Sequence, residues 1–265
     1  MNAAPASTAA AGVIFLEGSI SFYANSKFGV NTGMAPGGYG VSGDVGYIMN
    51  VVTNPGQLNA VIEEYQNLPE GVVPIVRFCT AQDVSSCAFR DVDQAASFVR
   101  NMSNAIGRPV AVVSGPNEPL QEPWVTGGCS TANCAGDVSR VANATAGWMN
   151  SFLSKTGDLN NVIHLSPAFN TSETPFSNFV AAMKSAGADF SKLDGVAANA
   201  YEGSGGRSVT EVIQQLKQMG FSNIFITETG FDPNRANNQT SDPGNYEQTY
   251  NALVQAANDP AVMSL

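Results

Sequence analysis

Residues 72–78 (VVPIVRF), 91–106 (DVDQAASFVRNMSNAI) and 110–114 (VAVVS) form the stretch of sequence that decides the fold. The first and third segments are short, apolar and rich in β-branched residues, which is typical of buried strands. In the middle segment apolar residues recur at helical spacing from Val92 to Met102. The stretch therefore predicts a strand, a helix and a second, parallel strand.

The same alternation runs along most of the chain. The expected strands are 28–31, 47–52, 72–78, 110–114, 162–166, 194–200, 223–227 and 261–265. The expected helices are 55–67, 91–106, 137–154, 176–186, 209–219 and 246–258. This rhythm suits βα units of about 30 residues or more, which build either an open doubly wound sheet or a closed eight-stranded barrel. No glycine-rich phosphate loop follows any of these strands, so the predicted fold class is α/β, a (β/α)8 TIM barrel.

The domain boundaries follow from the same pattern. Residues 1–20 are expected to be an N-terminal tail or to supply an extra strand at 13–16, and residues 21–265 to form the barrel. The last apolar segment, 261–265, stands where an eighth strand is expected. We therefore expect a barrel without a visible eighth helix, truncated around strand 8.

The chain carries few charges. Only 13% of its residues are charged, 12 of them basic and 22 acidic, for a net charge of −10, against a usual charged fraction of about 25%. A nucleic-acid partner is not expected, because phosphate backbones are bound by clustered Lys and Arg. No apolar run approaches the roughly 20 residues of a membrane span. A surface wetted by neutral polar residues suits an exported protein with a hydroxyl-rich ligand.

The four cysteines fall into two short-range pairs, Cys79 with Cys87 and Cys129 with Cys134. Two short loops of this kind predict disulfides formed in an oxidising compartment, outside the cell or in its envelope. Free buried thiols and a zinc site are the alternatives, although the spacing does not fit a CxxC knuckle and the only histidine, His164, is distant in sequence.

Two expected strands end in a glutamate. The strand at 110–114 continues into Gly-Pro-Asn-Glu-Pro, which contains Glu118, and the strand at 223–227 continues directly into Glu228. Barrel enzymes carry their chemistry at the carboxyl ends of strands, and two βα units separate these two strands. We expect the glutamates to face one another across the barrel mouth, the arrangement that cleavage of a glycosidic bond requires.

Asn117-Glu118-Pro119 after a fourth strand, with Glu228 after a seventh, resembles clan A, the large clan of retaining glycoside hydrolases with (β/α)8 barrels. The resemblance extends from about residue 28 to residue 265. It implies that Glu118 is the general acid/base and Glu228 the nucleophile. It also implies a carbohydrate substrate.

The resemblance assigns further roles around the two glutamates. Asn117 is expected to hydrogen-bond the sugar 2-hydroxyl, and Tyr201 to steady the nucleophile from the sixth strand. Asn199 stands where many clan members have histidine. Arg77 is expected to support the nucleophile, with pairing to Asp83 as its alternative.

Other residues near the expected mouth have two interpretations. Trp124 either stacks on a sugar or packs under a lid, and Glu122, Glu202 and Asp232 are spare carboxylates that become candidates if the strand alignment slips. The loops 32–46 and 120–136 are expected to decide the choice of sugar.

The sequence thus predicts a secreted, retaining O-glycoside hydrolase that needs no cofactor and no metal. A carbohydrate-binding barrel without turnover is the alternative, and the intact pair of glutamates argues against it. A Schiff-base aldolase or a metal hydrolase is disfavoured, because no lysine falls at an expected strand end and His164 is expected to be structural.

Overall fold

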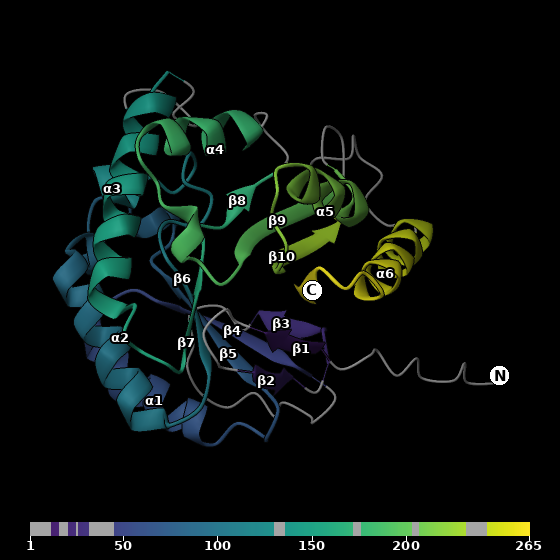
Figure 1. Ribbon diagram of the computed structural model, residues 1–265, viewed down its shortest axis with the longest axis horizontal. Coiled ribbons are helices and arrows are strands. Elements are labelled where there is room, and N and C mark those ends of the chain that lie inside the picture. The colour runs from purple at the N-terminus through teal and green to yellow at the C-terminus, as the bar shows by residue number, and fades with distance from the viewer. Residues whose placement is uncertain are drawn as a thin grey trace.

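Parallel strands lie in the middle of the molecule and helices surround them (Figure 1). The computed structural model describes residues 12–15, 21–24, 26–31, 45–129, 136–171, 176–202, 207–231 and 243–265. The fold is α/β, as the sequence predicts, with two parallel sheets and a short antiparallel hairpin.

The first parallel sheet has five strands in the order β3-β4-β5-β6-β7. Their bounds are Gly29–Asn31, Tyr47–Val52, Val73–Phe78, Val110–Val113 and Val162–Leu165. Each strand pairs with the next one along the chain, so this sheet is a succession of simple βα units.

The second parallel sheet has four strands in the order β11-β10-β9-β8. Its strands are β8 (Phe169–Asn170), β9 (Val196–Glu202), β10 (Ile224–Phe231) and β11 (Val262–Ser264). Three residues, Ser166, Pro167 and Ala168, separate β7 from β8. Proline has no N–H to donate to a ladder, which fits an interruption at this point.

Hydrogen bonds join the two sheets at two seams. At the first seam the backbone N–H of Gly29 donates to Leu265 O (2.9 Å), and Leu265 N–H donates to Lys27 O (2.8 Å). At the second seam Ser166 N–H donates to Gly195 O (3.0 Å), next to a parallel bridge between Leu165 and Gly195. β3 and β7, the outer strands of the first sheet, are therefore both tied to the second.

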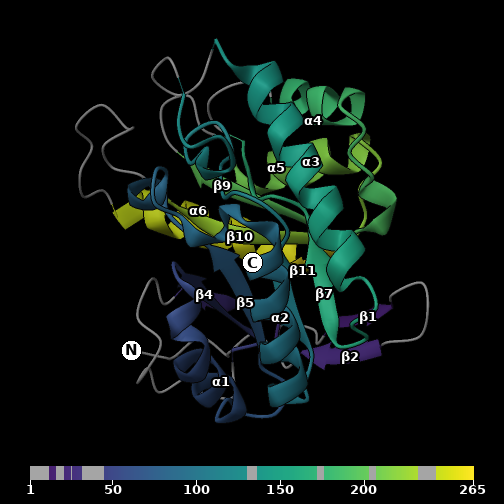
Figure 2. The same ribbon diagram turned by 90° about the vertical axis from the view of Figure 1, so that its left-hand side faces the viewer.

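Helices follow the strands and cover their outer side. They are α1 (Leu58–Gln66), α2 (Val92–Ile106), α3 (Val138–Thr156), α4 (Phe176–Ser185), α5 (Val209–Gln218) and α6 (Pro243–Ala257). Figure 2 shows α1, α2 and α3 lying over the five-stranded sheet. The ends carry ordinary signals: the Asp91 side chain accepts from Asp93 N–H at the start of α2, and Gly107 ends it at φ 63°. Among the described helices, none is long and apolar enough to cross a bilayer.

Side chains alternate between an inner and an outer apolar cluster along the strands. On β5, Val73 and Ile75 belong to the inner cluster between the sheets, whereas Val76 and Phe78 pack outward against helices. On β9, Ala197 is inner while Val196 and Ala198 are outer. This period of two, which is inherent in a strand, decides which polar side chains reach the interior at the strand ends.

The predicted elements agree with the structure apart from some boundaries, two short strands and several 3₁₀ turns. The extra strand expected at 13–16 is β1 (Gly12–Phe15), and its antiparallel partner β2 (Ser21–Ala24) is not predicted by the sequence pattern. β8 is the second unpredicted strand. The helix expected at 55–67 starts as a 3₁₀ turn at Pro55–Gln57. Most of the loop 32–46 and the part of 120–136 from 130 to 135 lie outside the described residues.

Candidate active site

The inner face of β5 and β9 continues into polar residues at the carboxyl ends of these strands. Arg77 follows Ile75 by two positions on β5, and Asn199 and Tyr201 follow Ala197 by two and four positions on β9. Strand alternation therefore turns these three side chains toward the space between the sheets. They come from distant parts of the sequence and meet there.

Glu118 lies in a tight turn after β6. Its φ is 42°, in the left-handed region that side chains other than glycine rarely adopt. Three backbone hydrogen bonds fix it: Glu118 N–H donates to Ala168 O (2.7 Å), and Glu118 O accepts from the N–H groups of Gln121 (2.7 Å) and Glu122 (2.9 Å). The turn therefore sets the direction of the side chain, as strained positions at functional sites often do.

Glu228 reaches the site through an irregularity in β10. Ile226 pairs with Ala198 and Glu228 pairs with Asn199, so Thr227 is an extra residue in the register. Such a bulge redirects the side chains that follow it. Without it, strand alternation would place Glu228 on the face opposite to Phe225 and Thr227, away from the inner cluster.

Arg77 and Tyr201 hold the carboxylate of Glu228. Arg77 Nη1 donates to Glu228 Oε1, and the hydroxyl of Tyr201 donates to Oε2. Each carboxylate oxygen thus has its own donor, one of them a cation, and both interactions favour the ionised form. Arg77 and Tyr201 thus both contact Glu228, the residue that they are expected to support, and Asp83 instead caps the turn at Thr80.

Asn199 links the other glutamate to its neighbours. Its Nδ2 donates to Glu118 Oε1 (3.0 Å) and to Asn117 Oδ1 (3.0 Å), and its Oδ1 accepts from the hydroxyl of Thr227 (2.9 Å). Asn199 is fully buried. From this buried position Asn199 orients the side chains of Glu118 and Asn117. Thr227 was not predicted, and no sequence signal distinguishes it from an ordinary strand residue.

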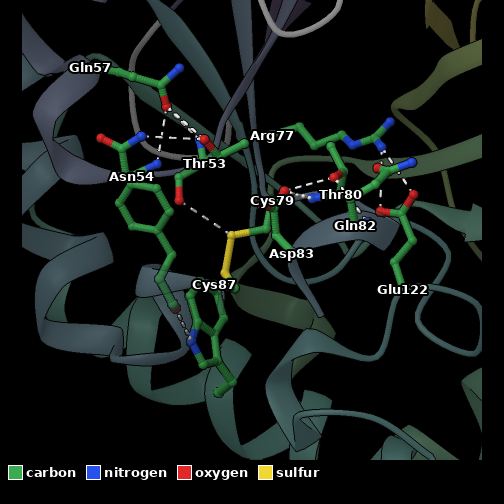
Figure 3. The surroundings of a disulfide bond; sticks show 12 residues. Thr53, Asn54, Gln57, Arg77, Cys79, Thr80, Gln82, Asp83, Cys87 and Glu122 are labelled. Carbon is green, nitrogen blue, oxygen red and sulfur yellow. Dashed lines mark hydrogen bonds and ion pairs between the residues drawn. A yellow bond between two sulfur atoms is a disulfide. The ribbon is translucent and has the colours of Figure 1, made fainter. Parts of the chain in front are cut away.

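A third carboxyl group, Glu122, joins the site from the turn after Glu118. Its two oxygens accept from Arg77 Nη2 at 3.2 and 3.3 Å, and the pair is buried. Figure 3 shows the Arg77 guanidinium alongside this carboxyl, near the Cys79–Cys87 disulfide. Burial raises the pKa of Glu122 to about 7, against the lowering effect of Arg77. The sequence signal for Glu122 is a charged residue four positions after Glu118 in a chain that has few charges.

A cavity of about 180 Å³ lies against Glu228 and Tyr201. The apolar part of its lining includes Met49, Ile75 and Ile226. A larger hollow of about 870 Å³ is lined by the loops that precede β9 and β10, at the opposite edge of the sheets. It is lined by none of the residues predicted for the site, whereas the smaller cavity is lined by two of them, Tyr201 and Glu228.

Trp124 and His164 have structural positions. Trp124 is 0% exposed and packs edge-on against Trp148, with ring centroids 5.3 Å apart. The interpretation as a sugar platform is therefore wrong, because no face of the ring is open to a ligand; the ring packs against Trp148 of α3 instead. His164 is buried beside the hydroxyl of Thr156, 2.9 Å from Nε2.

The three cysteines that the structure describes are oxidised. Cys79 and Cys87 form a disulfide, as predicted. Cys129 is also disulfide-bonded, and Cys134, its predicted partner, lies outside the described residues, as does Asp232. Disulfides are consistent with an oxidising compartment. Within the described ranges, no three His, Cys, Asp or Glu side chains gather as a metal site would require.

Comparisons of the chain with models of known protein families and with curated proteins found no match.

Proposed function

We propose that the two parallel sheets form a closed (β/α)8 barrel and that its mouth is the active site of a glycoside hydrolase. Eight parallel segments support closure: β3 to β7 and β9 to β11, with hydrogen bonds across both seams. In this count β6 is the fourth strand and β10 the seventh. Glu118 and Glu228 follow these two strands, as in the clan that the sequence resembles.

The proposed reaction is a double displacement on a neutral poly- or oligosaccharide. Glu118 donates its proton to the glycosidic oxygen while Glu228 Oε attacks the anomeric carbon, so the leaving alcohol departs and a glycosyl ester of Glu228 forms. Glu118, now ionised, then removes a proton from water, whose oxygen attacks the same carbon and releases Glu228. No cofactor takes part in the proposed reaction.

The observation that carries this proposal is the contrast between the partners of the two glutamates. Glu228 faces a guanidinium and a phenol, which both favour a carboxylate. Glu118 accepts from the neutral amide of Asn199, a bond that the carbonyl oxygen of a protonated acid can keep. The two glutamates therefore have different partners, in keeping with the different roles that the first step gives them.

A panel of aryl glycosides and neutral polysaccharides tests the proposal, with the wild type, Glu118→Ala, Glu228→Gln and the exposed control Glu63→Gln on α1. We expect Glu63→Gln to match the wild type and Glu228→Gln to lose at least about 10³-fold in kcat, in line with loss of a nucleophile. Glu118→Ala should keep activity on substrates with an activated leaving group, and azide should accelerate it.

Two results would contradict the proposal. One is a wild type that binds oligosaccharides without cleaving any member of the panel, which would support the carbohydrate-binding alternative. The other is turnover that survives in Glu228→Gln.

A further inference from the structure

The proposed reaction uses two carboxyl groups, and the site contains a third, Glu122, at its base. Glu122 is 8% exposed and Arg77 is 7% exposed. Three donors point at the Glu122 carboxyl: the Arg77 guanidinium, the side chain of Asn117 and the backbone N–H of Ala81. Because each of these groups donates to a carboxylate oxygen, the three contacts favour the ionised form of Glu122, against the effect of burial.

Glu122 is connected to both proposed catalytic groups. On one side Arg77 spans Glu122 and Glu228, one guanidinium nitrogen for each. On the other side Asn117 contacts Glu122 and accepts from Asn199, which also donates to Glu118. Glu122 therefore closes a chain of polar contacts that runs from Glu228 to Glu118.

The position of Glu122 is itself fixed by two elements. Its N–H donates to Glu118 O in the turn after β6 (2.9 Å). Ala81 belongs to the loop closed by the Cys79–Cys87 disulfide, which begins two residues after Arg77. The same covalent loop thus carries a donor to Glu122 and adjoins the arginine that Glu122 binds.

We infer that Glu122 is a positioning residue that, when ionised, holds Arg77 on Glu228 and Asn117 beside Glu118. The inference rests on the proposed function. Glu122 does not touch the reacting atoms in this scheme and acts through Arg77 and Asn117.

The charged groups around Glu122 decide how its protonation affects the site. Arg77 on β5 attracts its ionised form, Glu118 on the preceding turn repels it, and Glu228 lies beyond Arg77. Burial is the largest influence and, together with Glu118, raises the pKa of Glu122 to about 7. Below that pH the carboxyl is neutral and accepts more weakly from Arg77 and Asn117, so these two side chains are held less firmly in place.

The kinetic test compares the wild type with Glu122→Gln across pH 5 to 9. Glutamine has the same shape but is neutral at every pH. We expect the ratio of kcat/KM, wild type over variant, to be near one at the acid end. It should rise to about 10–100 at the alkaline end, following a single proton with a midpoint near 7, because displaced catalytic groups lose rate steeply. A structural role alone would give a ratio that does not change with pH. A flat ratio in an active enzyme would overturn the inference.

A second arm needs no turnover. Side-chain ¹⁵N–¹H signals of Arg77 and Asn117, followed by NMR, should shift together with a midpoint near pH 7 in the wild type and in Glu63→Gln, and stay fixed through that range in Glu122→Gln. Signals that do not move in the wild type would overturn the inference. If they move but no glycoside is cleaved, the proposed function fails while the contact network stands.

Discussion

Arg77 stands between two carboxylates, and its planar guanidinium is what allows it to serve both. Each of its Nη atoms has a separate acidic partner. Lysine keeps the charge but concentrates it at one nitrogen on a flexible stem, so it cannot reproduce a rigid two-sided contact.

We expect Arg77→Lys to fold but to lose about 10²-fold or more in kcat, because Glu228 is no longer held in one orientation. Steady-state kinetics measures the loss. Arg100→Lys is the matched control: Arg100 pairs with Asp158 on the surface, where ion pairs contribute at most about 1 kcal/mol. Equal kcat values in the two variants would show that the guanidinium of Arg77 has no special part.

Glu122 should also affect stability in a pH-dependent way. Its pKa is about 7 in the folded protein and its ordinary value is 4.5, so between these values the folded chain holds a proton that the unfolded chain releases. Unfolding therefore becomes easier as the pH rises from 4.5 to 7, by at most about 3 kcal/mol. This stabilisation is fully present only at lower pH.

The Tm difference between Glu122→Gln and the wild type measures this effect. The Tm of the variant should rise relative to that of the wild type as the pH rises from 4.5 to 7. The size of the change is roughly 2–4 °C per kcal/mol for a chain of this size. A Tm difference that stays constant from pH 4.5 to 7 would contradict the raised pKa of the buried Glu122 carboxyl.

At the scale of elements, the loop closed by the Cys79–Cys87 disulfide links stability to the site. Both cysteines are buried and are eight positions apart. A short closed loop contributes about 2–3 kcal/mol through the unfolded state. In addition, this loop presents the N–H of Ala81 to Glu122.

The double variant Cys79→Ala/Cys87→Ala should therefore lose about 2–3 kcal/mol of unfolding free energy and also lose kcat at temperatures where it remains folded. Urea unfolding and kinetics at 20 °C separate the two effects. Lost stability with unchanged kcat would mean that the loop does not position Glu122.

The sequence predicts the long elements well and the local irregularities poorly. Apolar periodicity locates β5, α2 and β6, because burial on a fixed face leaves a repeating pattern. The extra residue at Thr227, the interruption at Pro167 and the left-handed turn at Glu118 depend on contacts with segments far away in sequence. Those features direct the side chains of the proposed catalytic residues. The sequence therefore singles out Glu118 and Glu228 as candidates, but it does not predict the link between them through Glu122.

At the scale of the whole molecule, the first seam depends on β11. Val262, Met263, Ser264 and Leu265 are buried, and Leu265 exchanges backbone hydrogen bonds with Lys27 and Gly29. Burying each large apolar side chain contributes about 1.5–3 kcal/mol. The burial of Val262, Met263 and Leu265 together therefore contributes a free energy comparable with the whole free energy of unfolding of an average domain.

Deleting residues 262–265 should therefore abolish cooperative unfolding, whereas Leu265→Ala should retain it with a loss of about 2–3 kcal/mol. Circular dichroism during urea titration distinguishes the two. A deletion variant with a normal transition would contradict the role given to the first seam in joining the sheets.

The proposed double displacement requires that Glu228 form a covalent bond to the sugar. Activated 2-deoxy-2-fluoro glycosides that match a cleaved aryl glycoside slow the second step of a double displacement more than they slow formation of the glycosyl ester. Mass spectrometry of the digested protein should then find one sugar on the peptide that contains Glu228. It should find none in Glu228→Gln. A sugar attached to another residue, or hydrolysis with no trapped ester and inverted product configuration, would contradict a double displacement at Glu228.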